Sequence, residues 1–416
     1  MWSGCQTVHD VNVLLNFDVE SLCEQLILDE KCFYILTNSR SMNERDAVAV
    51  TSLVLDNIKE ACDRTNYSKP ISFISRGDSC LRGHYPAEVD TIKTFMRKSM
   101  ADTNKIVTIM MPAFIEGGRI TKDSVHYVKE GDSLIPVGNT PFALDPHFSF
   151  KSSNLCDYVV EKTSGRITAS QVKRVTLDDM RSVDVTTAIR NIVNILQSCD
   201  NEDVVVVDLE VPSDMVTFML ALLKCEQKHQ EFTFVYRTAA SFVATRCGIA
   251  QKPLLSENDI ISSTSSNHGT GGLIVVGSYV PKTTAQLAVL SQTMNIHAME
   301  FDVLFFQILR ANSHKLATAM VESLSQQINK LLLSGRHVVL YTSRREIITS
   351  HNEPADGIDE FTAISDALTA VVSGLEVVPA FLIAKGGITS HEVAHKGLNV
   401  SKARVVGQVT AGVPGK

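Results

Sequence analysis

The stretch CFYILTNSRSMNERDAVAVTSLVLDNIKEACDRTNYSKPISFIS (residues 32–75) contains one complete strand, helix and strand in succession. Residues 32–39 and 71–75 are short apolar runs with aromatic side chains, which is typical of strands. Between them, residues 44–64 carry apolar side chains at three- and four-residue spacing, which predicts an amphipathic helix. This order of elements favours an α/β fold with a parallel sheet.

The same alternation continues along the chain. Further strands are predicted at 106–114, 203–211, 231–237, 272–279, 296–303, 337–343 and 380–387, and helices at 283–294, near 312–334 and near 359–373. Residues 256–271 are rich in Ser, Asn and Gly, which indicates a linker. We therefore expect two α/β domains with largely parallel sheets, at residues 1–255 and 272–416, and a ligand-binding cleft between them.

Composition limits the class of protein. The length of 416 residues suggests two or three domains, and 44% hydrophobic residues are enough for sizeable cores. A formal net charge of -7 argues against a nucleic-acid partner, which would need a basic face. The nine cysteines show no CxxC pair, and no uncharged run is long enough for a membrane span. We expect a cytoplasmic protein with reduced thiols and no membrane partner.

Arginines follow three predicted strands of the first domain. RGDSCLRGH (residues 76–84) comes directly after one strand, Arg119 follows Gly117 and Gly118 after another, and Arg40 follows a third. Because the carboxyl ends of parallel strands lie at one edge of a sheet, these arginines are expected to form an anion site, although solvated strand ends remain the alternative. The planar guanidinium suits a carboxylate. An adhesion role for the Arg-Gly-Asp triplet is disfavoured, because nothing else indicates secretion.

Two strand ends in the second domain are followed by small residues and a helix. The first carries Gly277 and Ser278, and the second has the sequence KGGITS (residues 385–390). Glycine lets the backbone approach phosphate oxygens, and a hydroxyl adds a donor, but the pattern also fits ordinary strand-to-helix connections. Neither stretch matches a Walker A loop or GxGxxG, which disfavours a P-loop protein or a dinucleotide-dependent oxidoreductase.

Other chemistry-bearing residues give weaker signals. Arg344 and Arg345 follow a strand and could reach a phosphate or lie in a solvated loop. His391 and His395 share one helix face and are predicted to be surface residues. Histidines show no metal-ligand spacing, so no metal site is predicted.

Six stretches together resemble the four-carbon acid sugar kinase family (DUF1537), which includes erythronate, threonate and 3-oxo-tetronate kinases. They are RGDSCLRGH (76–84), MPAFIEGGRIT (111–121), residues 137–167, VVGSYVPKTTAQL (275–287), YTSRRE (341–346) and residues 385–414. They keep the family's order and are spread along nearly the whole chain. Jointly they are highly specific, although no single one would suffice.

The resemblance implies an ATP-dependent kinase that uses Mg²⁺ and transfers the γ-phosphoryl group to the terminal hydroxyl of a four-carbon sugar acid. The first domain would hold the acid and the second ATP. The implied substrate-binding residues are Arg40, Asp78, Ser79, Arg82, Gly83 and Arg119, and the implied ATP-binding residues are Ser278, Gly386, Gly387, Ile388, Thr389 and Gly412.

The sequence also departs from the family pattern. Family members usually begin with a strand that leads into an Asp-Asp-x-Thr-Gly-Ala segment, and this chain lacks it, so no catalytic base is assigned. Cys80 stands where Thr is usual. The chain is expected to be truncated at both ends, which leaves a catalytically impaired fragment or a ligand-binding pseudoenzyme as the alternative function. Erythronate, threonate and 3-oxo acids are not distinguished, and a homo-oligomer or a fused partner enzyme remains open.

Overall fold

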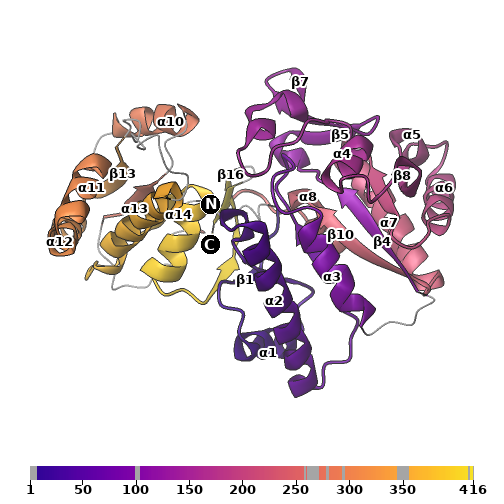
Figure 1. Cartoon of the computed structure of the whole chain (residues 1–416), viewed down its shortest axis with the longest axis horizontal. Coiled ribbons are helices and arrows are strands. Elements are labelled where there is room, and N and C mark those ends of the chain that lie inside the picture. Colours follow the sequence, from indigo (N-terminus) through magenta and orange to yellow (C-terminus); the bar gives the residue numbers. More distant parts are fainter. Residues whose placement is uncertain are drawn as a thin grey trace. The chain divides into compact units, whose positions relative to one another are not determined.

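The computed structural model describes residues 7–98, 104–256, 259, 271–277, 281–292, 296–343, 356–410 and 413–415. The chain divides into two units, coloured by sequence in Figure 1. The larger unit comprises Ser3–Leu254 and Lys402–Lys416, and the smaller comprises Leu255–Ser401 with Met1–Trp2. Both units are α/β bodies with largely parallel sheets, as the alternation of strands and helices predicts.

The central sheet of the larger unit is parallel throughout. In the described part of the chain its order is β3 (Ile74–Arg76), β10 (Phe232–Thr238), β4 (Lys105–Met111), β9 (Val204–Val207) and β8 (Val172–Val175). All four residues of β9 are buried, because the strand lies inside the sheet with both faces covered. The continuous run VVVV is therefore the expected sequence of such a strand.

Helices connect these strands and pack on the sheet. Those of the larger unit are α1 (Val19–Leu28), α2 (Glu44–Thr65), α3 (Ala87–Arg97), α4 (Leu155–Lys162), α5 (Leu177–Met180), α6 (Val185–Gln197), α7 (Pro212–Lys228) and α8 (Ala240–Arg246). Helix α2 begins where the Asn43 side chain accepts a hydrogen bond from the backbone N–H of Asp46, and it ends at Asn66 in the left-handed conformation. Its apolar residues at helical spacing, including Val54 and Ile58, are buried.

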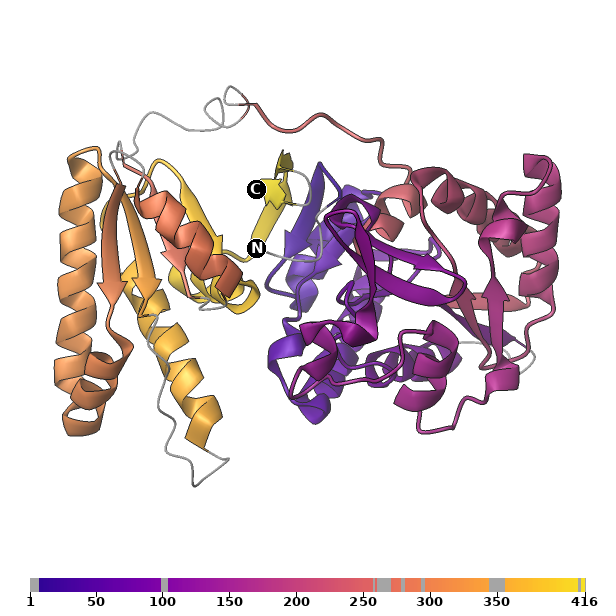
Figure 2. The ribbon, with the colours of Figure 1, turned by 90° about the horizontal axis from the view of Figure 1, so that it is seen from above.

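The end of the chain, Lys402–Lys416, belongs to the larger unit of the structure, whereas the sequence-based expectation includes it in a second domain at 272–416. Strand β15 (Lys402–Val405) pairs antiparallel with β1 (Val11–Leu14), and β1 pairs parallel with β2 (Phe33–Ile35) (Figures 1 and 2). Arg404 also donates a 2.8 Å hydrogen bond from Nη1 to Glu30 Oε1. The sequence analysis predicts no strand at 402–405, and no local pattern shows which sheet such a strand joins, because pairing is a tertiary choice.

Smaller sheets complete the larger unit. Strands β5 (Arg119–Lys122), β6 (Val125–Glu130) and β7 (Ser133–Pro136) form an antiparallel meander, and β16 (Gly407–Thr410) pairs antiparallel with β17 (Val413–Gly415). The single-turn helices are η1 (Ser39–Ser41), η2 (Ile115–Gly117), η3 (Val137–Asn139), η4 (Pro141–Leu144) and η5 (Ala169–Gln171).

The smaller unit has its own parallel sheet, seen edge-on between helices in Figure 2. Its order in the described part is β12 (Ile296–Phe301), β13 (His337–Thr342), β11 (Leu273–Val276) and β14 (Leu382–Lys385). The helices are α10 (Pro281–Ser291), α11 (Val303–Asn312), α12 (His314–Leu333), α13 (Asp356–Ser373) and α14 (Gly387–Glu392), which continues into the π-turn η6 (Val393–Gly397). Two separate apolar clusters cover the two faces of the sheet.

Two further sequence expectations can be compared with the structure. The eight cysteines within the described ranges are free thiols. None of the helices described is long and apolar enough to cross a membrane.

Candidate functional site

The loop Arg76–His84, called here the arginine loop, leaves the carboxyl end of β3 and is held by neighbouring elements. The Gly77 N–H donates to Thr238 O at 2.8 Å, which extends the β3–β10 ladder by one residue. Farther along, the Tyr158 hydroxyl donates to Leu81 O at 3.0 Å. The His84 ring packs edge-on against Phe148, and its Nε2 lies 3.0 Å from Ser39 O. The loop is therefore a fixed part of the domain.

Asp78 lies at the centre of the loop's polar contacts. Arg82 Nε donates to Asp78 Oδ2 at 2.9 Å, and Arg40 Nη1 lies 3.5 Å from Asp78 Oδ1. Burial favours the neutral acid, but the charges of Arg82, Arg40 and Arg76 outweigh it and hold the pKa of Asp78 below its usual value. Asp78 is therefore an ionised anchor for the arginines.

Arg82 is positioned from a second side by the segment after η4. Its Nη1 lies 3.7 Å from Asp145 Oδ2, and its guanidinium carbon lies 4.8 Å from the centre of the Phe142 ring. Only Nε is used in the close bond to Asp78, and an arginine has five N–H donors. Arg82 is therefore held in one orientation, and its Nη donors are not used in the close bond to Asp78.

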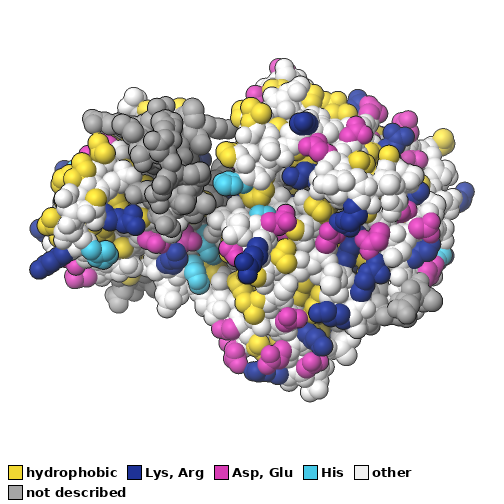
Figure 3. Space-filling view, viewed as in Figure 1, with side chains coloured by type: hydrophobic (Ala, Val, Ile, Leu, Met, Phe, Trp, Pro, Cys, Tyr) yellow, Lys and Arg dark blue, Asp and Glu magenta, His cyan; other side chains and the backbone are white. Residues whose placement is uncertain are grey.

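The structure brings Arg40, Arg76 and Arg82 together around Asp78, although their strands belong to different sheets. Strand β2, which precedes Arg40, lies in the sheet with β1, whereas β3 lies at the edge of the central sheet. The prediction that one sheet edge carries all the arginines is therefore wrong in detail. Figure 3 shows positive and negative side chains interspersed over the visible face of the larger unit. The arginine cluster is thus a local feature of an acidic chain.

Arg119, the first residue of β5, lies near Cys80 of the arginine loop. Its guanidinium interacts with the Cys80 thiol, lies 6.0 Å from the centre of the Phe114 ring and donates to Gly117 O. Cys80 itself is buried, and burial raises the pKa of its thiol. Arg119 therefore lies beside the arginine loop, as predicted, but is held by its own turn.

Arg237, at the end of β10, supports the arginine loop and was missed by the sequence analysis. Its Nη1 donates to Glu88 Oε2 at 2.8 Å and to Ser75 Oγ at 2.9 Å, and its side chain is only 7% exposed. A Cβ atom at Gly77 would lie 2.6 Å from the Arg237 guanidinium carbon, and one at Gly83 would lie 2.9 Å from Nη2. Both glycines are therefore needed for the close approach of Arg237. The available signal was that the predicted strand 231–237 also ends in arginine.

Ser79 is buried, and its backbone is held by His126 of β6. His126 Nε2 lies 2.8 Å from Ser79 O, and its Nδ1 lies 2.9 Å from Thr121 Oγ1. A carbonyl can only accept, so Nε2 carries the proton and Nδ1 accepts from the Thr121 hydroxyl. Burial lowers the pKa of His126 to about 4, so the ring is neutral near pH 7.

Acidification should destabilise the larger unit through His126. The unfolded chain binds a proton near pH 6.5, whereas the folded ring stays neutral to about pH 4, so stability is lost as pH falls below 6.5. Between pH 7 and pH 5 we expect this residue to remove about 2 kcal/mol from the free energy of unfolding. Urea denaturation of His126→Gln should show a shallower pH dependence than wild type. His147→Gln, at an exposed position, should retain the wild-type dependence; equal slopes for all three proteins would contradict the assignment.

In the smaller unit, the turn after β14 meets the end of β11. The two strands are adjacent, with Val276 beside Lys385. Gly386 has φ of 115°, a conformation that favours glycine, and a Cβ atom at Gly277 would lie 2.3 Å from Thr389 Oγ1. The predicted residues Gly386, Gly387, Ile388 and Thr389 thus form one turn packed against Gly277. Gly387 and Ile388 are exposed.

The remaining predictions concern other parts of the chain. Ser278, Gly412, Arg344 and Arg345 lie outside the described residues. His391 and His395 are half-buried with rings stacked 5.5 Å apart, so their prediction as surface residues is wrong. Burial lowers the pKa of His391. Within the described ranges, no group of three or more His, Cys, Asp or Glu side chains could hold a metal ion.

Two known domain types match the chain. Residues 2–246 match a sugar-binding N-terminal domain, and residues 273–415 match a nucleotide-binding C-terminal domain. The class of protein is therefore one that binds a sugar-related ligand in one domain and a nucleotide in the other. The chain belongs to the DUF1537 family, the family that its sequence motifs resemble.

Solved structures share this fold. A Salmonella typhimurium LT2 protein, provisionally described as a tRNA synthase, is 12% identical with a TM-score of 0.62, covering 97% of this chain and 90% of that chain. Haemophilus influenzae protein HI1011, of the DUF1537 family, is 14% identical with a TM-score of 0.57, covering 97% and 91%. Comparison with curated protein sequences finds no match. At these identities the likeness concerns the fold alone.

Proposed function

We propose that the chain is an ATP-dependent kinase that phosphorylates the terminal hydroxyl of a four-carbon sugar acid such as erythronate, threonate or a 3-oxo-tetronate. The observation that carries the proposal is the cluster of Arg40, Arg76 and Arg82 around one ionised aspartate in the sugar-binding domain. An uncharged sugar would not need such a cluster, whereas a sugar acid supplies the carboxylate that arginines bind best.

The proposed roles follow from the positions of the side chains. Arg82 and Arg40 would bind the substrate carboxylate, and Arg119 would contribute from β5. Asp78 keeps Arg82 and Arg40 oriented through its own hydrogen bonds. The backbone of Ser79 and Gly83 would shape the loop around the sugar hydroxyls.

In the nucleotide-binding domain, ATP would lie on the Gly386–Thr389 turn. Glycine at 386 and 387 would let a phosphate approach the backbone closely, and the Ile388 side chain, 51% exposed, offers apolar surface beside this turn. Ser278 and Gly412 remain candidates for the same ligand. Mg²⁺ usually takes most of its ligands from phosphate oxygens and water, so it would accompany ATP without a protein cage.

A second candidate function is ligand binding without catalysis. It is favoured by the chemistry of Asp78, because a carboxylate whose pKa is held down by arginines is a weak general base. Phosphoryl transfer depends mainly on positioning and charge stabilisation, so this observation weakens a role for Asp78 as base and leaves the kinase as the first candidate.

The test measures ADP release by the purified chain with ATP, Mg²⁺ and each acid in turn, alongside nucleotide-induced thermal shifts. We expect ADP release that requires one of the acids. A thermal shift by ATP without ADP release for any acid would support the binding module. If ATP causes no thermal shift and none of the acids supports ADP release, both proposed functions are wrong.

A pair of glycine variants tests the ATP site. Gly277→Ala places a methyl group against Thr389, and overpacking of this kind should lower ATP affinity about tenfold. Gly397→Ala brings its Cβ 3.4 Å from Val372, an ordinary contact, and should bind ATP as wild type does. Equal ATP affinity in both variants would show that the turn is not the nucleotide site.

A further inference from the structure

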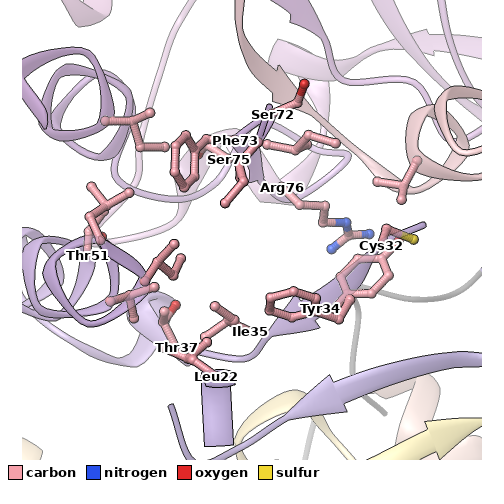
Figure 4. Close-up of a pocket in the computed structure, with 18 of the residues that line it drawn as sticks. Leu22, Cys32, Tyr34, Ile35, Thr37, Thr51, Ser72, Phe73, Ser75 and Arg76 are labelled. Atoms are coloured by element: carbon pink, nitrogen blue, oxygen red, sulfur yellow. The ribbon is translucent and has the colours of Figure 1, made fainter. Parts of the chain in front are cut away.

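Two cysteines from distant parts of the sequence lie together in the larger unit. A cavity of about 590 Å³ lies between strands β2 and β3, and Cys32 and Cys247 both line it. Cys32 directly precedes β2, and Figure 4 shows it among the side chains around the cavity, with its sulfur in yellow. Cys247 directly follows α8. Both are half-buried free thiols, called here the cavity pair.

The two thiols of the cavity pair are in contact. The Cys32 thiol donates a hydrogen bond to the sulfur of Cys247. A disulfide requires two sulfur atoms to approach to about 2 Å, which is possible only for cysteines that are neighbours in the fold. The cavity pair meets this requirement.

Positive charge surrounds the second member of the pair. The hydrogen bond from Cys32 and the cations of Arg246 and Lys31 lower the pKa of Cys247, although burial acts in the opposite direction. A Cβ atom at Gly248 would lie 3.9 Å from Lys31 Nζ, which places this ammonium group beside the end of α8. Cys247 is therefore the member that more readily becomes a thiolate, the form of cysteine that attacks disulfides.

The first member of the pair has the opposite character. The same hydrogen bond, burial and the nearby Glu30 carboxylate raise the pKa of Cys32. Its proton is held between the two sulfur atoms. The pair thus combines an attacking sulfur at 247 with a second sulfur at 32 that can close a disulfide.

Two other neighbouring pairs of cysteines differ in this respect. Cys23 lies near Cys62, and Cys199 lies near Cys225. Burial raises the pKa of Cys62, that of Cys199 to about 12 and that of Cys225 to about 11. Because little thiolate forms at these positions near pH 7, their reaction with disulfides should be slow. Charge as well as proximity therefore distinguishes the cavity pair.

We propose that the cavity pair is a thiol–disulfide exchange site for low-molecular-weight disulfides such as oxidised glutathione. The Cys247 thiolate attacks one sulfur of the small disulfide, which forms a mixed disulfide at Cys247 and releases one small thiolate that takes a proton from water. Cys32 then loses its proton to water and attacks the Cys247 sulfur, which forms the Cys32–Cys247 disulfide and releases the second small thiol. The small disulfide is reduced to two thiols, and the two protein thiols are oxidised to one disulfide.

The disulfide would link two parts of the larger unit. Strand β2 lies in the sheet with β1, whereas α8 follows β10 of the central sheet. A cross-link between positions so distant in sequence restricts the unfolded chain and thereby stabilises the folded one. Oxidation should therefore raise the urea concentration at which half of the protein is unfolded.

The test incubates the reduced full chain with oxidised glutathione at pH 7, blocks the remaining thiols with N-ethylmaleimide and maps the disulfides by peptide mass spectrometry. We expect linked peptides that contain Cys32 and Cys247, together with a higher urea midpoint that dithiothreitol reverses. Absence of this linked pair would overturn the proposal. A glutathione adduct that persists at Cys247 of the wild-type chain would also overturn it.

Single variants separate the roles of the two thiols. Cys32→Ser should stop the reaction at the mixed disulfide, so that Cys247 keeps one glutathione. Cys247→Ser should take up glutathione at Cys32 about tenfold more slowly or less, because that thiol is rarely ionised. Cys62→Ser, from another neighbouring pair, is the matched control and should form the Cys32–Cys247 disulfide as wild type does. Equal rates of uptake in the first two variants would overturn the assignment of Cys247 as the attacking thiol.

A pH profile tests the hydrogen bond between the two sulfur atoms. The rate of Cys247 alkylation by iodoacetamide follows its thiolate fraction, so its midpoint reports the pKa of Cys247. Cys32→Ala removes the donor and should move this midpoint to higher pH, whereas Cys62→Ala should leave it unchanged. An unchanged midpoint in Cys32→Ala would contradict the proposed cooperation of the two thiols.

Discussion

Replacing Arg237 with methionine should lower the free energy of unfolding by about 3–5 kcal/mol, because the change leaves the Glu88 carboxylate without its cationic partner in a largely buried position. It also removes the donor to Ser75 and the group on which Gly77 and Gly83 pack. Urea denaturation at pH 7 measures the loss. The arginine loop should be the first region to lose amide protection.

The controls for Arg237 separate charge from packing. The double variant Arg237→Met with Glu88→Gln removes both charges and should regain part of the lost stability. Arg64→Met also removes an arginine from two glutamates, Glu20 and Glu60, but at an exposed position, and should leave stability unchanged. If Arg237→Met lowers the free energy of unfolding no more than Arg64→Met does, the proposed support role of Arg237 is wrong.

Replacing Arg82 with alanine should weaken sugar-acid binding by about 10²–10³-fold, the usual cost of removing one partner from a desolvated charge pair. The loss combines the missing contact to the substrate carboxylate with the loss of the 2.9 Å bond that orients Asp78. Calorimetric titration with erythronate and threonate measures the affinity. ATP affinity should not change, because the Gly386–Thr389 turn proposed to bind ATP lies in the other unit.

Arg82→Lys refines this result. Lysine restores a positive charge without the planar fork, so it should recover only a part of the affinity. Arg64→Ala serves as the matched control and should bind both ligands as wild type does. Unchanged sugar-acid affinity in Arg82→Ala would show that the arginine loop is not the substrate site.

Much of the arginine cluster could be predicted from position in the sequence. Arg40, Arg82 and Arg119 were identified because they follow strands, and in the structure Arg40 and Arg82 contact Asp78 while Arg119 contacts Cys80. The same reasoning would have found Arg237 at the end of 231–237. It was missed because only the adjacency of β10 to β3 places Arg237 beneath the arginine loop.

The sequence by itself determined the elements and the classes of domain. Apolar periodicity is a local property, so the strand–helix alternation, the helix predicted at 44–64 and the glycine-rich turn at 386–389 could be read directly. Family motifs added the sugar-binding and nucleotide-binding domains.

Only the tertiary structure decided which strands are neighbours. Hydrogen bonding between strands is the same for every sequence, so no local pattern shows that β15 joins β1, that β10 separates β3 from β4, or that a cavity separates β2 from β3. The burial of Arg237, the neutral His126 and the ionised Asp78 depend on those neighbours. Their charge states are set by desolvation and nearby charge, which exist only once the chain has folded.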